Sequence, residues 1–533
     1  MATLEAEILA CIRSSSALPR PHSRNSLDLP VELWSTVWLN LPFSSRVAAS
    51  QTCRQWRINT LACQDLWTDI CVQIWDDKFC ECAICEDTLY NKRRSSTQIA
   101  PTRLAQLLGR SGKRDVSLEI IIHGQLDYAR DHVVAAIAEG LINHAQRVRS
   151  LYVHASDNVS IPKLVHQLPI LGNMKHLKVS SLEENEIGFL LTGTLDAPRL
   201  EQVMIGGSLL GLASPEAVQA ISLPSLKALQ CTVSSAQELV DAVRIAATGS
   251  LKSLHLCLSC FVEEDFTMSL TNLSLICSLL AAMPLSSITM ANMCSQDEQL
   301  IMAFAQLKVN HIIFQLFPGA SDIDESFTII PSSLLAPTEL IYSRVQAVDG
   351  GYTTNTLKES LRWFTFSVID TNHATLATGV AHRRDLYWDM SRLQQLPILW
   401  DKLPNDTYQS LRVMTIDSDL LHIFQGTEHT NLTWPNVHTV AVQVVPEGIR
   451  LASPVHALPM LSLPALKTLK VEASLTQDII WLDIEVFRHS ILLPILGDRM
   501  VELMLFTGIT LHSAEVPVQL SELARNAKVI CFE

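Results

Sequence analysis

Long apolar runs, a basic leader and an excess of positive charge are all missing from this sequence. The most apolar window, residues 273–284, is too short to span a bilayer and ends at a proline, so we expect a buried helix there. The N-terminus contains Glu5 and Glu7, whereas a secretion signal begins with basic residues. The sequence therefore predicts neither a membrane partner nor secretion.

Basic residues are in the minority. The chain has 40 Lys and Arg against 54 Asp and Glu, which gives a net charge of −14. A net negative chain is a poor partner for nucleic acid or anionic membranes. The short basic runs at 92–94 and 383–384 have no interleaved aromatic residues, so we expect them to be solvated. We predict no nucleic-acid partner, and a chain that tolerates basic partners better.

A regular cysteine framework is also absent, because the thirteen cysteines are unevenly spaced. Without a secretion signal they are most simply reduced thiols, which predicts a cytoplasmic or nuclear protein, or both. Cys80, Cys82 and Cys85 form the one cluster that resembles a metal site. Structural zinc takes four ligands, and no second pair lies at a fitting distance. We therefore predict no metal and no cofactor, and we keep a zinc-assisted enzyme using these thiols as a rival interpretation.

Signatures of catalysis are missing as well. The seventeen histidines are scattered, and no Gly-rich phosphate loop or nucleophile motif accompanies them. A Ser–His–Asp set would require the fold to bring distant residues together. We predict a chain that is not an enzyme.

Residues 29–67 carry the strongest positive signal. Pro30 stands where a helix would begin, Leu33, Val37 and Leu41 repeat at helical spacing, and Pro42 ends that helix. Two further short helices follow. Four motifs occur here in order: Leu29-Pro30-Val31-Glu32-Leu33, Leu41-Pro42, Cys53-Arg54-Gln55-Trp56-Arg57 and Leu66-Trp67.

This ordered pattern resembles the F-box family. The resemblance implies that the segment lays helices against a groove of the Skp-type adaptor of a cullin–RING ubiquitin ligase. The matching positions are Leu29, Pro30, Leu33, Leu41, Pro42, Cys53, Trp56, Leu66 and Trp67. Some of them would face the adaptor and others would hold the helices together, and the sequence does not sort the two groups. The alternative is an ordinary three-helix segment with a tryptophan core.

A second pattern, apolar-x-x-apolar-x-apolar, recurs beyond residue 115. Its middle apolar positions in the first five copies are separated by 26, 26, 26 and 25 residues: Leu151, Leu177, Val203, Leu229 and Leu254. Further copies occur at 285–290, 309–314, 361–366, 411–416, 437–442, 466–471, 500–505 and 527–532. Two gaps of about two periods each predict degenerate copies near Leu340 and Leu386.

Each hexapeptide reads as a short strand, and the segments between them have helical spacing. A strand and a helix in every period predict parallel stacking into a solenoid. The pattern resembles the leucine-rich-repeat family in a divergent form, which implies an α/β horseshoe with a parallel β-sheet on its concave face. A doubly wound α/β domain is the alternative. The expected organisation is an N-terminal mobile segment (1–26), a small all-α F-box (27–72), a linker and connecting helix (73–114) and the solenoid (115–533).

Together the two resemblances point to F-box/leucine-rich-repeat proteins, of a kind abundant in fungi. They imply a substrate-recognition subunit of an SCF-type ubiquitin ligase, with the adaptor, and through it a cullin, as partners. The repeats would bind an unidentified protein substrate through outward-facing strand positions: Tyr152, His154, Lys178, Gln202, Met204, His255, Trp363, Thr365 and Met504. The alternative is a protein-interaction scaffold that works outside any ligase.

Overall fold

The computed structural model describes residues 30–75, 104–123, 130–155, 171–181, 198–208, 223–247, 249–258, 269–293, 298–316, 333–334, 337–344, 363–370, 381–389, 405–418, 421, 433–444, 462–473, 480–496, 499–512 and 524–530. The first described segment forms three short helices and a 3-10 turn: α2 (Val31–Leu39), α3 (Phe43–Thr52), α4 (Arg54–Ala62) and η1 (Gln64–Trp67). Pro30 and Pro42 cap the first two helices, and the Cys53 thiol accepts a hydrogen bond from the Trp56 amide at 3.4 Å. The three predicted helices are confirmed.

Tryptophans form the core of this helical unit. The Trp34 and Trp38 rings lie 5.5 Å apart, and Trp56 from α4 packs against both. The Trp67 indole is fully buried and donates to the Thr60 carbonyl at 2.8 Å. The buried Arg46 guanidinium donates to three backbone carbonyls, those of residues 39, 41 and 66, and so links α3 to the end of α2 and to η1.

The rest of the described chain is organised around one 17-stranded sheet. Its strands are β1 (Asp69–Trp75), β2 (Val116–His123), β3 (Val148–Ala155), β4 (His176–Ser181), β5 (Gln202–Ser208), β6 (Ala228–Val233), β7 (Ser253–Leu258), β8 (Ser287–Met293), β9 (His311–Leu316), β10 (Glu339–Arg344), β11 (Trp363–Asp370), β12 (His382–Asp389), β13 (Val413–Asp417), β14 (Thr439–Val444), β15 (Thr468–Ala473), β17 (Val501–Thr507) and β19 (Ala524–Ile530). A separate parallel pair, β16 (Ile480–Asp483) and β18 (Ile509–His512), lies beside the C-terminal strands.

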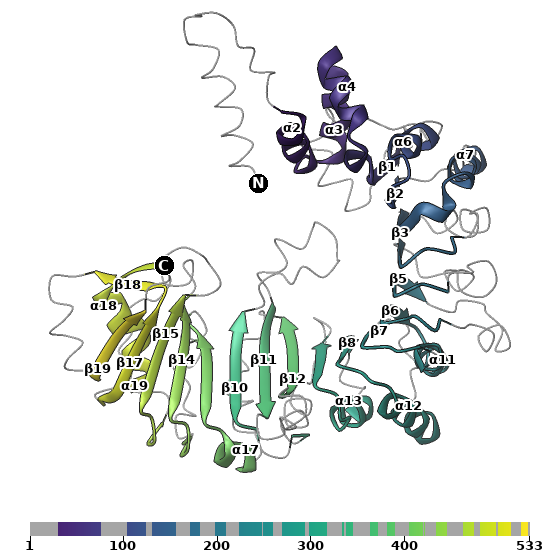
Figure 1. Cartoon of the computed structure of the whole chain (residues 1–533). Helices are drawn as coiled ribbons and strands as arrows, with labels where there is room; N and C mark the ends of the chain where they lie inside the picture. Colours follow the sequence, from purple (N-terminus) through teal and green to yellow (C-terminus); the bar gives the residue numbers. More distant parts are fainter. Residues whose placement is uncertain are drawn as a thin grey trace, which may run out of the picture.

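Most neighbouring strands are parallel and follow the chain order. β1 to β9 pair consecutively, and β13, β14, β15, β17 and β19 do the same. Figure 1 shows the strands following one another around an arc, with helices on its outer side. A large, mostly parallel sheet with alternating helices is thus the architecture, as the repeat predicted.

The middle of the sheet departs from that prediction. β12 pairs with β9, β11 with β12, and β10 with β11 and β13, so these three strands stand in reverse chain order. β10 and β12 are the strands expected near Leu340 and Leu386. β11, however, runs antiparallel to both neighbours, so the prediction of a parallel repeat strand at 361–366 is wrong. Antiparallel pairing thus replaces the expected parallel pairing on both sides of β11.

The helices between strands are α6 (Leu104–Arg110), α7 (Arg130–Ile142), α11 (Ala236–Ala247), α12 (Leu270–Ala282), α13 (Glu298–Ala305) and α17 (Asn405–Ser410), with short 3-10, α and π turns at Ala145–Arg147, Ile484–Phe487, Arg488–Leu492 and Leu493–Leu496. α12 is the helix predicted over 273–284, and it buries Leu273, Ile276 and Leu280. In the described part of the chain, no helix is long and apolar enough to cross a membrane.

A continuous row of side chains under the sheet forms the core. Buried side chains align in register strand by strand: Ile70, Leu118, Leu151, Leu177, Val203, Leu229, Leu254, Ile288, Ile312, Arg384, Val368, Leu340, Met414, Val440, Leu469 and Met504. The predicted middle anchors from Leu151 to Leu254 are among them, whereas Leu503, the predicted anchor of the 500–505 copy, is half-buried. Arg384 is the exception in this apolar row, and it is only 2% exposed. The expectation that the basic pair 383–384 is solvated is therefore wrong for Arg384.

The helical unit covers the first edge of the sheet. β1 begins directly after η1, pairs with β2, and lies in contact with α3 and α6. The sheet therefore starts near residue 69, well before the expected boundary at 115. Gly112, in the turn after α6, has a φ of +61°, and a Cβ there would lie 2.5 Å from the Gln64 side chain. The positive φ favours glycine in this turn, whereas the exposed end of the Gln64 side chain could move aside.

Candidate functional site

Exposed apolar side chains gather on two helices of the N-terminal unit. Of the ten large hydrophobic side chains exposed in the described residues, six belong to α2 and α4. These six are Val31, Leu33, Val37, Leu39, Ile58 and Leu61, and we call the exposed side of α2 that carries Leu33 and Val37 the apolar helical face. Leu33 and Val37 lie one helical turn apart, so they point to the same side of α2. Concentrated exposed apolar surface of this kind is typical of protein interaction sites.

The tryptophan core explains why this face is turned to solvent. Trp34 and Trp38 direct the other side of α2 onto α4, so the stripe of Leu33 and Val37 is left outside. From the sequence, that stripe looked like an ordinary helix face with no indication of whether it would be buried. The 54% exposure of Leu33 assigns it to the surface.

The structure sorts the predicted adaptor-binding residues into three groups. Pro30, Leu33 and Pro42 are exposed, whereas Leu41, Cys53 and Trp56 are partly buried. Leu66 and Trp67 are fully buried, so in this arrangement they stabilise the helical unit and offer no surface to a partner. Leu29 lies outside the described residues.

The second candidate surface is the inner face of the sheet, defined by the strand positions that point away from the helices. In β6 and β7 these positions alternate regularly with buried ones. Register joins them into a row that crosses six strands: Tyr152, Lys178, Met204, Gln230, His255 and Thr289. Five predicted substrate-binding residues lie on this face and are partly or fully exposed: Tyr152, Lys178, Gln202, Met204 and His255.

Polar side chains of β3 and β4 contact one another on the inner face. His154 Nδ1 lies 2.6 Å from the Ser180 hydroxyl, and the Tyr152 hydroxyl lies 3.3 Å from the same atom. The Lys178 ammonium stands 4.7 Å from the centre of the Tyr152 ring. His154, predicted as exposed, is only 4% exposed and is held beneath this cluster.

Burial controls the ionisation of this cluster. It lowers the pKa of His154, and the nearby Lys178 charge lowers that pKa further. Burial also raises the pKa of Tyr152 and lowers the pKa of Lys178. We therefore expect a neutral imidazole and a neutral phenol at pH 7, beside a lysine ammonium.

His255 makes the fold sensitive to acid. Burial lowers its pKa to about 4, so between pH 6.5 and pH 4 the unfolded chain binds a proton that the folded chain does not. Stability is therefore fully present above pH 6.5 and falls as the pH drops, by about 2–3 kcal/mol at pH 4. We expect His255→Asn to flatten this part of the stability–pH profile, measured by denaturant unfolding at several pH values. An unchanged slope in that variant would contradict the assignment.

Not every predicted inner-face residue lies there. Met504 is fully buried, so its assignment to the inner face is wrong. Met504 pairs with the buried Leu469, so the buried positions of β17 are shifted by one residue from those expected from the sequence. A shift of one residue moves a strand side chain to the other face. Trp363 and Thr365 lie on the antiparallel β11, opposite Asp389 and Tyr387, and their side chains are outside the described residues.

A polar cluster that the sequence did not reveal lies where β9 meets β12. The Asp385 carboxylate is fully buried and accepts from His311 Nε2 at 2.8 Å and from Arg383 Nε at 2.7 Å. Burial alone would raise the pKa of Asp385, but the His311 hydrogen bond and the Arg383 charge outweigh it and lower the pKa. His311 lies 74 positions before Asp385 in the chain, and no sequence motif links the two.

Two of the imidazole contacts described above lie on different strands, and a further one, between Ser150 and His176 at 2.9 Å, joins β3 and β4. The hydroxyl–imidazole pair of Ser180 and His154 is on β3 and β4, whereas the imidazole–carboxylate pair of His311 and Asp385 is on β9 and β12. Within the described residues, His154 Nε2 has no hydrogen-bond partner, so no carboxylate orients that ring. The hydroxyl and the carboxylate of these two pairs thus contact different histidines.

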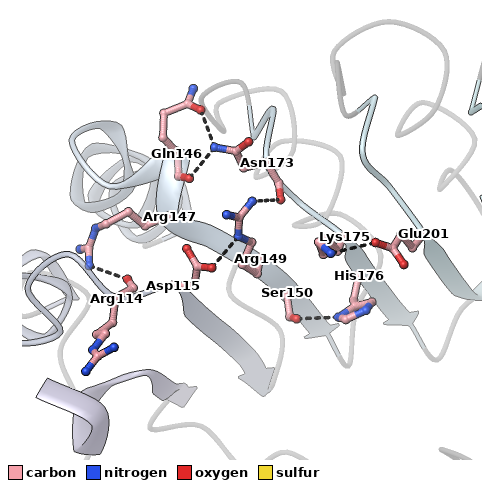
Figure 2. Close-up of polar contacts among 10 residues, drawn as sticks. All are labelled: Arg114, Asp115, Gln146, Arg147, Arg149, Ser150, Asn173, Lys175, His176 and Glu201. Atoms are coloured by element: carbon pink, nitrogen blue, oxygen red, sulfur yellow. Dashed lines mark hydrogen bonds and ion pairs between the residues drawn. The ribbon is translucent and has the colours of Figure 1, made fainter. Parts of the chain in front are cut away.

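A row of charged residues, which the sequence analysis did not single out, lies along the ends at which the inner-face strands begin. Each follows the first apolar residue of its hexapeptide: Arg149, Lys175, Glu201, Lys227 and Lys252. Backbone hydrogen bonds join them in order, from the amide of each to the carbonyl of the one before. Figure 2 shows contacts of the first three: Arg149 pairs with Asp115 at 2.8 Å, and Lys175 pairs with Glu201 at 2.9 Å. We call the four cations the basic rim.

No group of three or more metal-ligating side chains occurs in the part of the chain that the structure describes. Cys80, Cys82 and Cys85 lie outside that part. Comparisons with protein-family models and with curated proteins found no match to this chain. Any functional assignment therefore depends on the residues and their geometry.

Proposed function

We propose that this chain is the substrate-recognition subunit of an SCF-type cullin–RING ubiquitin ligase. The helical unit at residues 30–67 acts as an F-box that binds the Skp-type adaptor, and the sheet acts as a divergent leucine-rich-repeat solenoid that binds the protein substrate. The apolar helical face is the observation that carries the proposal. The ordered motifs supply its helices, and the exposure of Leu33, Val37 and Ile58 leaves an apolar surface for a partner groove.

The arrangement of the two surfaces supports the same function. The helical unit is joined to the first strands through η1, α3 and α6, so a partner bound there would be held in a fixed relation to β1 and β2. The inner face offers a separate, more polar surface on the strands that follow. A receptor needs these two surfaces and no catalytic group, because it acts by raising the effective concentration of substrate near the transfer enzyme.

The proposal predicts a ternary complex. The full-length chain, co-expressed with a Skp-type adaptor and a cullin, should co-purify with both in equal molar amounts, as measured by size-exclusion chromatography with light scattering. The adaptor contacts the apolar helical face, and the cullin joins through the adaptor. Failure to bind the adaptor would overturn the assignment of the helical unit.

A scaffold that works outside any ligase is the second candidate, because the inner face would serve it equally well. Binding of the adaptor without recruitment of the cullin would favour this candidate. Recruitment of both partners would favour the ligase receptor.

A further inference from the structure

The inner face and rim of strands β3 to β8 carry a charge opposite to that of the whole chain. The stretches that form these strands and their starts, residues 148–155, 175–181, 201–208, 227–233, 252–258 and 286–293, contain five basic residues and one acidic residue. With histidine neutral, five minus one gives +4, and counting Asp115, the partner of Arg149, lowers this to +3, against −14 for the whole chain. This surface therefore attracts acidic partners, whereas the chain as a whole repels them.

The rim already holds one carboxylate. Glu201 accepts from Lys175 Nζ at 2.9 Å through one oxygen and from Lys227 Nζ at 2.6 Å through the other. The hydrogen bond from Lys227, followed by that from Lys175, lowers the pKa of Glu201 to about 2. Two lysines from neighbouring repeats thus bind one carboxylate between them. A carboxylate of a partner could be bound by rim lysines in the same way.

The inner row next to the rim carries no acidic side chain from β3 to β8. The first inner row next to the rim consists of small or neutral polar residues from β3 to β8: Ser150, His176, Gln202, Ala228, Ser253 and Ser287. Lys178 adds a further cation in the second row. Lys227 and Lys252 are exposed on adjacent strands, so their backbones are about 4.8 Å apart.

We propose that the inner face of β3 to β8, with its basic rim, binds an extended, carboxylate-rich segment of a protein partner. This inference rests on the proposed function, since it gives the substrate class of the receptor. Five inter-strand steps of about 4.8 Å span about 24 Å, which corresponds to about eight extended residues.

Other anions fit this surface less well. A phosphate group favours the two-pronged guanidinium of arginine, and Arg149, the rim's arginine, already contacts Asp115 and the Asn173 carbonyl. Single-stranded nucleic acid needs aromatic stacking surfaces, and Lys178 covers the Tyr152 ring.

The test measures binding of a labelled octaglutamate peptide to the full-length chain by fluorescence anisotropy. We expect binding at low salt that weakens as salt is added, and weaker or no binding of octaglutamine. The variant carrying Lys227→Gln and Lys252→Gln should bind octaglutamate about two- to thirtyfold more weakly, because each exposed ion pair contributes about 0.2–1 kcal/mol.

The matched control carries Arg412→Gln and Lys467→Gln, which remove cations at the same hexapeptide position on β13 and β15. This variant should bind octaglutamate as the parent does. No binding by the parent, equal weakening in both variants, or tighter binding of an oligouridylate than of octaglutamate would each overturn the inference. The assay contains no adaptor, so failure of the ligase proposal and failure of this inference are distinguishable.

Discussion

The variant carrying Leu33→Asp and Val37→Asp is expected to lose adaptor binding by about a thousandfold. Each side chain lies on the exposed side of α2, where a partner groove would bury it, and removal of a central apolar anchor costs about 2 kcal/mol or more. Isothermal titration with purified adaptor measures the loss. Because both residues are exposed, the free energy of unfolding should change by less than about 1 kcal/mol.

A matched control tests whether any exposed apolar pair would behave in this way. Leu270 on α12 and Met302 on α13 are 76% and 39% exposed and lie outside the helical unit. The variant carrying Leu270→Asp and Met302→Asp should bind the adaptor as tightly as the parent. If the α2 variant also retains binding, the apolar helical face is not the adaptor site. Trp56→Ala is a poorer probe, because it also removes the packing of Trp34 and Trp38.

Arg384→Ala is expected to destabilise the fold by about 3–5 kcal/mol. The Arg384 guanidinium closes the end of α13 by donating to the carbonyls of residues 305, 307 and 309, at 3.2, 2.7 and 2.9 Å. Its removal leaves buried acceptors without donors and a cavity in the core row. Burial lowers the pKa of Arg384 to about 10, which still leaves it charged at pH 7.

Denaturant unfolding, followed by hydrogen exchange at α13 and β12, measures this effect. Arg384→Lys should recover part of the lost stability, since an ammonium keeps the charge but does not reproduce the fork of donors. Lys308→Ala removes an exposed cation in the same turn and should change stability by less than about 0.5 kcal/mol. Equal effects of Arg384→Ala and Lys308→Ala would contradict the capping role.

The repeat in the sequence was sufficient to predict the strands and their buried sides. Leu151, Leu177 and Leu229 are buried as expected because period-two alternation in a strand fixes which side chains share a face. The same alternation carries no information about strand direction, so β11 was read as one more parallel strand. The assignment of faces also depends on the residue at which the pattern is taken to begin. Starting the pattern at Met500 placed Met504 on the wrong face.

Other features depend on contacts that no local pattern contains. Arg384 occupies an apolar position only because the carbonyls at the end of α13, more than 70 residues earlier, require a donor there. β1 was missed because the helical motifs run up to Trp67 and the strand follows at once. The basic rim, in contrast, was visible in the sequence, since its cations recur at one position of the hexapeptide.

The reversed order of β12, β11 and β10 has a consequence for how the chain folds. In a simple repeat array, each strand pairs with the next one made, and structure can propagate from one end to the other. Here β9 pairs with β12, and β10 pairs with β13. Each of these pairings closes a loop of about 70 residues. Long loop closures slow folding, which sets β1–β9 and β13–β19 as the two stretches in which structure can grow first. We therefore expect the pairings of β9 with β12 and of β10 with β13 to form last and to link the helical unit's half of the sheet to the C-terminal half.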